Sequence, residues 1–212
     1  MKITILILVF TILTPLFIFS QPKGFLKVKN KQSVAQKISS ASNKIKTIQS
    51  SFKQYKHLDI LSNDIISEGK FSFKTSNLLR WQYIKPYDYL ILMNGSNMWI
   101  NDGKKTKKYD TGSNKMFKEI NDLMLGLLQG DILKSKNFNL QLFENKKYIL
   151  AELIPKSPEM KEFLSSINIY FDKLDYSVSK VKMSEHSGDY TKIEFFNKKN
   201  NISISDSKFS IK

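Results

Sequence analysis

Apolar residues near the start of the chain recur at helical spacing. Ser33 can cap a helix, because its hydroxyl can accept a hydrogen bond from a backbone N–H of the first turn. The apolar positions after it are spaced by four, three, four and three residues, the pattern of one helix face. They are Val34, Ile38, Ala41, Ile45 and Ile48. We therefore expect one amphipathic helix that covers apolar surface elsewhere in the protein.

From about residue 50 to residue 110 the pattern changes to the alternation that is typical of strands. In two successive segments large apolar residues alternate with polar ones: Phe71 and Phe73 in the first, then Leu79, Trp81 and Tyr83. Pro86 ends the second segment, and the apolar residues 89–93 lead into Asn94-Gly95, a strong hairpin signal. This region is predicted to be a meander of antiparallel strands.

The second half of the chain contains both patterns. Residues 114–129 return to helical spacing and end near Gly130, which predicts a second helix. Further strands are predicted at 138–143, 148–155, 167–172, 176–185, 190–196 and 202–212, with a brief helical segment at 157–166. The sum is a single α+β domain of about ten antiparallel strands and inserted helices. A sheet with so many strands in so short a chain must curl, and it half-encloses a space.

The first 20 residues have the character of a signal peptide. Lys2 precedes a long apolar run, and Ser20-Gln21 offers a small residue at a cleavage point. The alternative is an uncleaved anchor helix, because the run is close to the length that spans a bilayer. Pro15 and the polar break after it favour cleavage near Ser20 and export. The expected organisation is a signal peptide at 1–20, a linker at 21–32 and one domain at 33–212.

Composition narrows the class of protein. The chain contains no cysteine, so an exported protein of this kind has no disulfide bonds and its stability comes from its core. The formal net charge is +15, yet Arg80 is the only arginine. Nucleic-acid sites favour the bidentate fork of arginine, so we interpret the charge as solvated surface and expect no nucleic-acid partner. Lysines can also attract a protein to anionic membranes or acidic partners.

The sequence offers little for catalysis. The two histidines, His57 and His186, lie among polar neighbours without a second ligand at helical or hairpin spacing. Acidic pairs such as Asp172 with Asp175 fall in predicted loops, where they are common turn residues. Motifs of serine hydrolases, phosphate-binding loops and zinc proteases are absent. We expect no enzyme, cofactor or metal site; two facing carboxylates in a cleft would instead favour a secreted hydrolase.

The most informative feature is the concentration of large apolar residues in the middle of a lysine-rich chain. Alternation places Leu79, Trp81 and Tyr83 on one face of a strand, with Phe71 and Phe73 beside them. Either positions 91 and 93 or positions 90 and 92 continue that face on the next strand. These residues either fill a core or line a binding site that the Leu- and Met-rich second helix covers.

The order of several short motifs resembles a known family. A helix is followed by Ser51-Phe52-Lys53-Gln54, then by Glu68-Gly69-Lys70-Phe71, and then by Arg80-Trp81-Gln82-Tyr83. Pro86 and a turn that leads into Trp99 complete the series. The chain resembles the periplasmic outer-membrane lipoprotein carrier family, the LolA-like proteins, most clearly from about residue 33 to residue 130.

The resemblance implies an incomplete antiparallel β-barrel in which helices form a lid over an apolar cavity for lipoprotein acyl chains. The positions that it assigns to lipid binding are Phe71, Phe73, Leu79, Trp81, Tyr83, Ile91, Met93 and Trp99. The lid residues are Leu123, Met124, Leu127 and Leu128. The family commonly has a basic residue and a proline before the Arg-Trp strand, where this chain has Lys74-Thr75-Ser76-Asn77, so Lys74 and Arg80 are the candidates for a latch on the lid.

The function implied by the resemblance is that of a monomeric periplasmic carrier that takes lipoproteins from the inner to the outer membrane. Its implied partners are the lipoprotein cargo, an ATP-driven inner-membrane releasing complex and an outer-membrane receptor. A domain of the same fold that senses lipid or lipoprotein and regulates another protein is the alternative.

Overall fold

One antiparallel sheet organises the protein. The computed structural model describes residues 21–75, 77–110, 126 and 130–211, and these residues form a sheet of 12 strands. The strands are β1 (Leu26–Lys27), β2 (Thr47–His57), β3 (Ile65–Lys74), β4 (Leu78–Lys85), β5 (Tyr89–Asn94), β6 (Asn97–Asn101), β7 (Thr106–Asp110), β8 (Phe138–Glu144), β9 (Tyr148–Pro155), β10 (Ser166–Asp172), β11 (Val178–Ser184) and β12 (Tyr190–Asn200).

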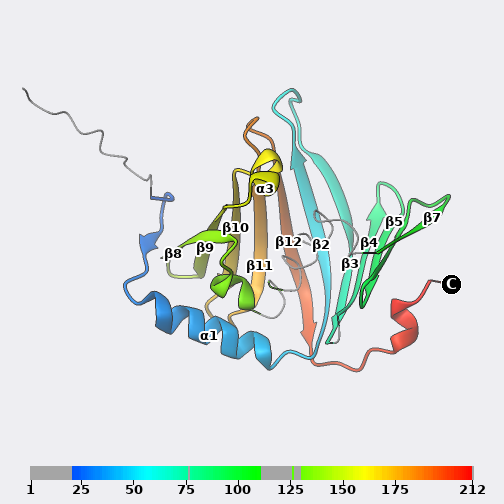
Figure 1. The fold of residues 1–212 in the computed structure, drawn as a ribbon, viewed down its shortest axis with the longest axis horizontal. Helices are drawn as coiled ribbons and strands as arrows, with labels where there is room; N and C mark the ends of the chain where they lie inside the picture. Colours follow the sequence, from blue (N-terminus) through cyan, green and yellow to red (C-terminus); the bar gives the residue numbers. More distant parts are fainter. Residues whose placement is uncertain (1–20, 76, 111–125, 127–129, 212) are drawn as a thin grey trace, which may run out of the picture.

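The strand order shows how the two halves of the chain join. It runs β1-β8-β9-β10-β11-β12-β2-β3-β4-β5-β6-β7, so two meanders meet where β12 pairs with β2. At this junction Phe195 lies opposite Phe52. The sheet bends but its edge strands, β1 and β7, do not pair with each other (Figure 1). The expected α+β fold with an unclosed antiparallel barrel is confirmed.

Three segments of the chain differ from the strands predicted from the sequence. β1 lies in the stretch expected to be a linker and pairs with β8. β7 was not expected, because Tyr109 is the only large apolar residue of this strand. The tail after residue 201, predicted as a strand, instead holds a short 3-10 helix, η2 (Asp206–Phe209). Two-residue strands and polar edge strands carry too little hydrophobic alternation to be recognised in a sequence.

The first helix is shorter than its apolar pattern. α1 spans Lys31–Asn43, and its cap is Asn30, whose side-chain oxygen accepts a hydrogen bond from the Ser33 backbone N–H at 2.9 Å. Ser33 is therefore not the cap, Ile45 lies beyond the end of the helix, and Ile48 lies in β2. The β-branched pair Thr47-Ile48 favours a strand, which ends the helix although the spacing of apolar residues continues.

The brief helix expected near residue 157 is α3 (Pro158–Phe163), capped by Ser157.

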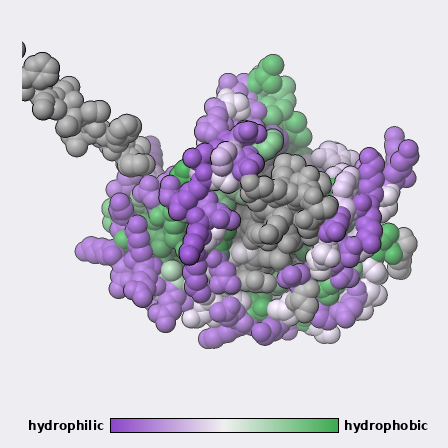
Figure 2. All heavy atoms as spheres, viewed as in Figure 1, coloured by the Kyte–Doolittle hydropathy of each residue, from purple (hydrophilic) through white to green (hydrophobic). Residues whose placement is uncertain are grey.

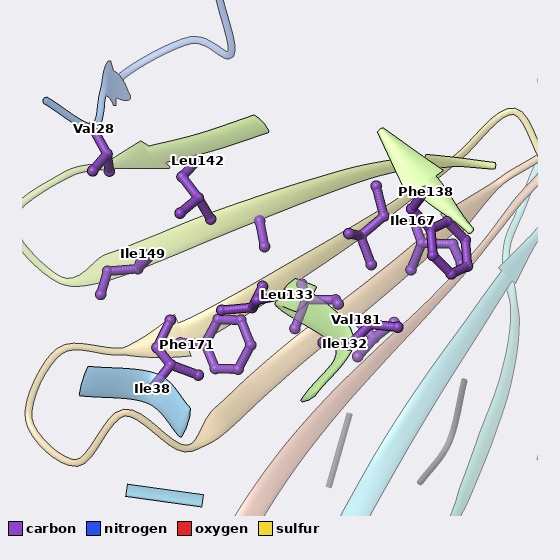
Figure 3. Close-up of a cluster of buried hydrophobic side chains, with 13 residues drawn as sticks. Val28, Ile38, Ile132, Leu133, Phe138, Leu142, Ile149, Ile167, Phe171 and Val181 are labelled. Atoms are coloured by element: carbon purple, nitrogen blue, oxygen red, sulfur yellow. The ribbon is translucent and has the colours of Figure 1, made fainter. Parts of the chain in front are cut away.

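The larger hydrophobic cluster joins α1 to one half of the sheet. Ile38 of α1 is fully buried, and Figure 3 shows it beside Phe171 of β10. Residues 132 and 133 of a second 3-10 helix, η1 (Asp131–Lys134), enter the same cluster. The strand residues come from β8 to β11, so α1 and η1 cover that half of one sheet face, which we call the inner face.

Figure 2 shows that hydrophilic residues dominate the described surface in this view. Green, hydrophobic residues gather at the top, over the connection between β2 and β3, where the exposed large apolar residues are Ile60, Leu61, Ile65 and Ile66. Within the described residues, no helix has both the length and the apolar character needed to cross a membrane.

Candidate functional site

The second hydrophobic cluster lies on the inner face of the other half of the sheet. Cross-strand register aligns Phe71 of β3 with Trp81 of β4, and Trp81 with Ile91 of β5. A parallel row aligns Phe73 with Leu79, and Leu79 with Met93. Neighbouring residues in register point to the same face of a sheet. The structure thus brings together seven of the eight predicted lipid-binding residues: Phe71, Phe73, Leu79, Trp81, Tyr83, Ile91 and Met93.

Trp81 is the centre of this aromatic group, which we call the Trp81 cluster. Its ring lies 4.4 Å from that of Phe52, 5.5 Å from that of Phe71 and 5.9 Å from that of Phe195, measured between centroids. The Trp81 side chain is only 6% exposed. Because the described members come from strands alone, the cluster is a continuous apolar wall on the inner face.

Several members of the wall were not predicted as site residues, among them Phe52, Phe195 and Met98. Phe52 belongs to one of the motifs that carry the family resemblance, so a signal for it was present in the sequence. Phe195 joins only because β12 pairs with β2, and the two strands are more than a hundred residues apart in sequence. Sequence alternation alone could not select it.

Gly69 explains how Phe52 reaches the wall. Phe52 and Gly69 lie opposite each other on β2 and β3. A Cβ at Gly69 would overlap the Phe52 ring and the carbonyl oxygen of Gln82. The ring thus occupies the space over the glycine, which is the physical reason for glycine in the motif Glu68-Gly69-Lys70-Phe71.

The wall contains few polar groups. The Tyr83 hydroxyl donates a hydrogen bond to the Gln54 side-chain oxygen at 2.8 Å, and burial raises the pKa of Tyr83 above its ordinary value. The Trp81 indole Nε1–H is buried and interacts with the Tyr83 hydroxyl, although the two do not form a well-oriented hydrogen bond. Buried N–H groups are normally fully hydrogen-bonded, so this group is an incompletely satisfied donor on the wall.

The described residues offer no metal centre, because they contain no group of three His, Asp or Glu side chains that could hold an ion. His57 Nδ1 lies 2.9 Å from the Asp64 carboxylate at the β2–β3 hairpin, and the His57 ring stacks on Tyr190. His57 is thus one member of a pair at the hairpin, far along β2 from Phe52.

Comparison with known proteins decides the family. A model of the family described as "Outer membrane lipoprotein carrier protein LolA" matches residues 43–212. The chain belongs to the LolA family. The outer-membrane lipoprotein carrier protein of Francisella tularensis subsp. tularensis (strain SCHU S4 / Schu 4) is 28% identical to it over 200 residues, covering 85% of each chain. That of Francisella philomiragia subsp. philomiragia is 28% identical over 177 residues, covering 80% of this chain and 81% of the relative.

Solved structures share the fold of this LolA-family protein at low identity. An uncharacterized conserved protein from Thermus thermophilus has a TM-score of 0.52 at 9% identity, covering 84% of this chain and 91% of that chain. A chain of the MucA/MucB complex of Pseudomonas aeruginosa has a TM-score of 0.50 at 7% identity, covering 86% of this chain and 61% of that chain. At such identities the similarity supports the fold alone.

Trp99 corrects the predicted lining of the LolA-family site. It packs with Leu92 and with Phe209 of the C-terminal tail, on the opposite, outer face of the sheet. Successive strand residues alternate between faces, so Met98 of β6 takes the inner position, in register with Met93. The motif of a turn followed by Trp99 did not show whether Met98 or Trp99 faces inward.

The two predicted latch residues of the LolA-family chain also lie on the outer face. The Lys74 ammonium is 2.5 Å from the Asp206 carboxylate, and Arg80 Nη1 donates to the Lys208 carbonyl at 3.2 Å. Both residues therefore hold the C-terminal tail on the outer face, and their role as latches of a lid stays a prediction. The predicted lid residues Leu123, Met124, Leu127 and Leu128 lie outside the described residues.

Proposed function

We propose that this protein is a non-catalytic carrier that binds the acyl chains of lipoproteins against the Trp81 cluster. Membership of the LolA family and the carrier names of its relatives support this proposal. The observation that carries it is the apolar wall itself, which is built from strands β2 to β6 and β12. Apolar and aromatic walls with few polar groups are typical of sites that take hydrophobic ligands.

The energetics of an acyl chain favour a carrier with a weak grip. Burying one methylene contributes about 0.8 kcal/mol, so a sixteen-carbon chain carries on the order of 12 kcal/mol of transfer free energy. A site that captured all of it for each chain could not release its cargo. In this proposal the predicted helix at 114–129 packs on the wall in the empty protein through Leu123, Met124, Leu127 and Leu128, and cargo displaces it.

The buried Trp81 N–H adds a polar element to the proposed site. Acylated lipoproteins carry ester and amide carbonyl groups at the base of their hydrocarbon chains. One such carbonyl oxygen can accept a hydrogen bond from Trp81 Nε1, which has no well-oriented acceptor within the described part of the chain. The wall would then recognise both the hydrocarbon and its point of attachment.

The proposed route is across the periplasm, reached through the signal peptide at residues 1–20 with cleavage near Ser20. The partners we propose are an ATP-driven inner-membrane complex that loads the cargo and an outer-membrane receptor with a deeper apolar site. The carrier acts as a monomer in this scheme.

The two tryptophans allow a direct test, because they lie on opposite faces of the sheet. Trp99→Phe leaves Trp81 as the only tryptophan, and Trp81→Phe leaves Trp99, so excitation at about 295 nm, at the red edge of indole absorption, reports each one separately from the nine tyrosines. A triacylated lipopeptide with a bromine-labelled acyl chain should quench the fluorescence of Trp81 and leave that of Trp99 nearly unchanged, since bromine quenches only at short range. Titration of each variant with the lipopeptide gives its affinity and shows whether the acyl chain contacts the remaining tryptophan.

A charge on the wall provides the second arm of the test. Trp81→Glu should weaken lipopeptide binding by at least about tenfold, because the site would then bury a carboxylate. Circular dichroism checks that the variant is folded. Equal quenching of both tryptophans, or wild-type affinity in a folded Trp81→Glu variant, would show that the acyl chain binds elsewhere.

A further inference from the structure

A hollow on the outer face lies between the sheet and the C-terminal tail. Its volume is about 630 Å³. On the sheet side, the lining consists of Arg80 and of four residues that lie opposite one another on β3 to β6: Lys70, Gln82, Leu90 and Asn101. The C-terminal tail lines the other side. The lining residues are Lys70, Arg80, Gln82, Leu90, Asn101, Ser207, Lys208, Ser210 and Ile211.

Three cationic side chains meet at this hollow. Lys70 and Arg80 come from β3 and β4, and Lys208 comes from η2. No carboxylate is among the lining residues. Asp206, the nearest acidic residue in the tail sequence, is paired with Lys74. The charges of the hollow are therefore not balanced by the lining side chains.

The cationic groups retain free donors. Arg80 donates from Nε and Nη2 to the Gln82 side-chain oxygen, and from Nη1 to the Lys208 carbonyl. These bonds use three of the five guanidinium N–H groups, so two remain available to a ligand. Neither the Lys70 nor the Lys208 ammonium makes a hydrogen bond or ion pair within the described residues. Gln82 and the tail hold the guanidinium in place, so it is preorganised for a ligand.

Electrostatics point to an anion. Burial, followed by the nearby charges of Arg80 and Lys70, lowers the pKa of Lys208, and burial lowers the pKa of Arg80. Like charges at close range disfavour each other, and an anion between them would remove this cost. Some lysines of the protein pair with carboxylates, as Lys53 does with Glu68 and Lys173 with Glu144. The hollow differs from the rest of the lysine-rich surface because three cationic side chains, two of them partly buried, converge there without a carboxylate among the lining residues.

We propose that this hollow is a second binding site, for a phosphate-bearing molecule held by Lys70, Arg80 and Lys208. A guanidinium with flanking ammonium groups matches the oxygens and charge of a phosphate. The volume lies in the range of small-molecule sites, about 300–1,000 Å³, so it has room for a phosphate and its organic substituent. Leu90 and Ile211 supply an apolar border for that substituent. The site is on the face opposite the Trp81 cluster and does not depend on the carrier proposal.

The test uses the only arginine of the chain as a reporter. A ¹H–¹⁵N spectrum contains a single arginine Nε–H signal, which belongs to Arg80. Inorganic phosphate and glycerol 1-phosphate should shift this signal saturably. The double variant Lys70→Gln/Lys208→Gln should bind about tenfold more weakly or worse, because two charge-assisted contacts are lost. Its matched control is Lys136→Gln/Lys146→Gln, which removes the same charge from exposed lysines on other parts of the chain and should bind like the wild type.

Vesicle sedimentation separates the possible sources of the phosphate. A response to the soluble phosphates identifies a free phosphate compound. Binding to phosphatidylglycerol vesicles alone, lost in the hollow variant and retained in the control variant, identifies a lipid headgroup. The site is overturned if none of the three probes binds, or if both double variants lose binding equally. Lipopeptide quenching of Trp81 should be unchanged in Lys70→Gln/Lys208→Gln. The phosphate-binding test and the lipopeptide test can therefore fail independently of each other.

Discussion

Gly69 and Phe52 show how one missing side chain shapes the proposed site. The Phe52 ring lies where a Gly69 Cβ would be, and it contacts the Trp81 ring at 4.4 Å between centroids. The strand pairing of β3 with β4 is also irregular between Glu68 and Gly69, as at a β-bulge. The glycine therefore sets the position of the ring that supports Trp81.

Gly69→Ala should destabilise the protein by roughly 1–3 kcal/mol, because the added methyl overlaps the Phe52 ring and the Gln82 carbonyl. Combining it with Phe52→Leu should cost less than the sum of the two single changes by about 0.5 kcal/mol or more. Urea unfolding of the four proteins measures this coupling. Strict additivity would mean that the ring and the glycine do not share space.

Glu152 provides a prediction on pH. It lies on the outer face of β9, in register with Gln141 and Asn168, and burial raises its pKa above the ordinary value. The folded state thus disfavours the charged carboxylate. Stability is undiminished below the ordinary pKa of a glutamate and falls as pH rises through the raised folded-state pKa.

Glu152→Gln should therefore raise the melting temperature at about pH 7.5 and have little effect near pH 4, where the wild-type side chain is largely protonated. Thermal unfolding by circular dichroism at both pH values measures the difference. The matched control is Glu162→Gln, which makes the same substitution at an exposed position of the short helix α3. A lower melting temperature for Glu152→Gln at neutral pH would mean that its charge is stabilising.

Helix α1 shows why a cap must be located in three dimensions. Asn30→Ala should cost about 1 kcal/mol, because it removes the acceptor of the Ser33 N–H. Ser33→Ala should cost far less, since its side chain is not the cap. Chemical denaturation of both variants compares them directly, and a larger loss for Ser33→Ala would restore Ser33 as the capping residue.

The C-terminal tail is an element whose role sequence alternation misrepresents. Its residues alternate as in a strand, yet the segment packs on the outer face through Phe209 and Ile204, which are 1% and 7% exposed. Lys74 and Arg80 hold it by polar contacts. The prediction of a strand was therefore wrong: the tail packs on a face of the sheet rather than beside a neighbouring strand.

The protein as a whole combines a net charge of +15 with an apolar inner wall, and salt separates their contributions. Lipopeptide affinity should change by less than about threefold up to 1 M NaCl, where the Debye length is about 3 Å, because apolar contacts are not screened. Any binding of DNA should fall steeply over the same range. Fluorescence titration at several salt concentrations measures both. A steep loss of lipopeptide affinity would indicate that the lysine-rich surface binds the cargo.

Local patterns were sufficient for the meanders, the α+β class and the shared strand face of Phe71, Phe73, Leu79 and Trp81; that this face points inward was implied only by the family resemblance and is decided by the packing of the folded chain. Alternation and turn preferences involve residues that are close in sequence, so they can be recognised from the sequence alone. The choice of Ile91 and Met93 over their neighbours, the outward position of Trp99 and the entry of Phe195 required strand register. So did the contacts of Lys74 and Arg80 with the tail, which join residues about 130 positions apart. Register between distant strands is set by the packing of the folded whole, and no local spacing encodes it.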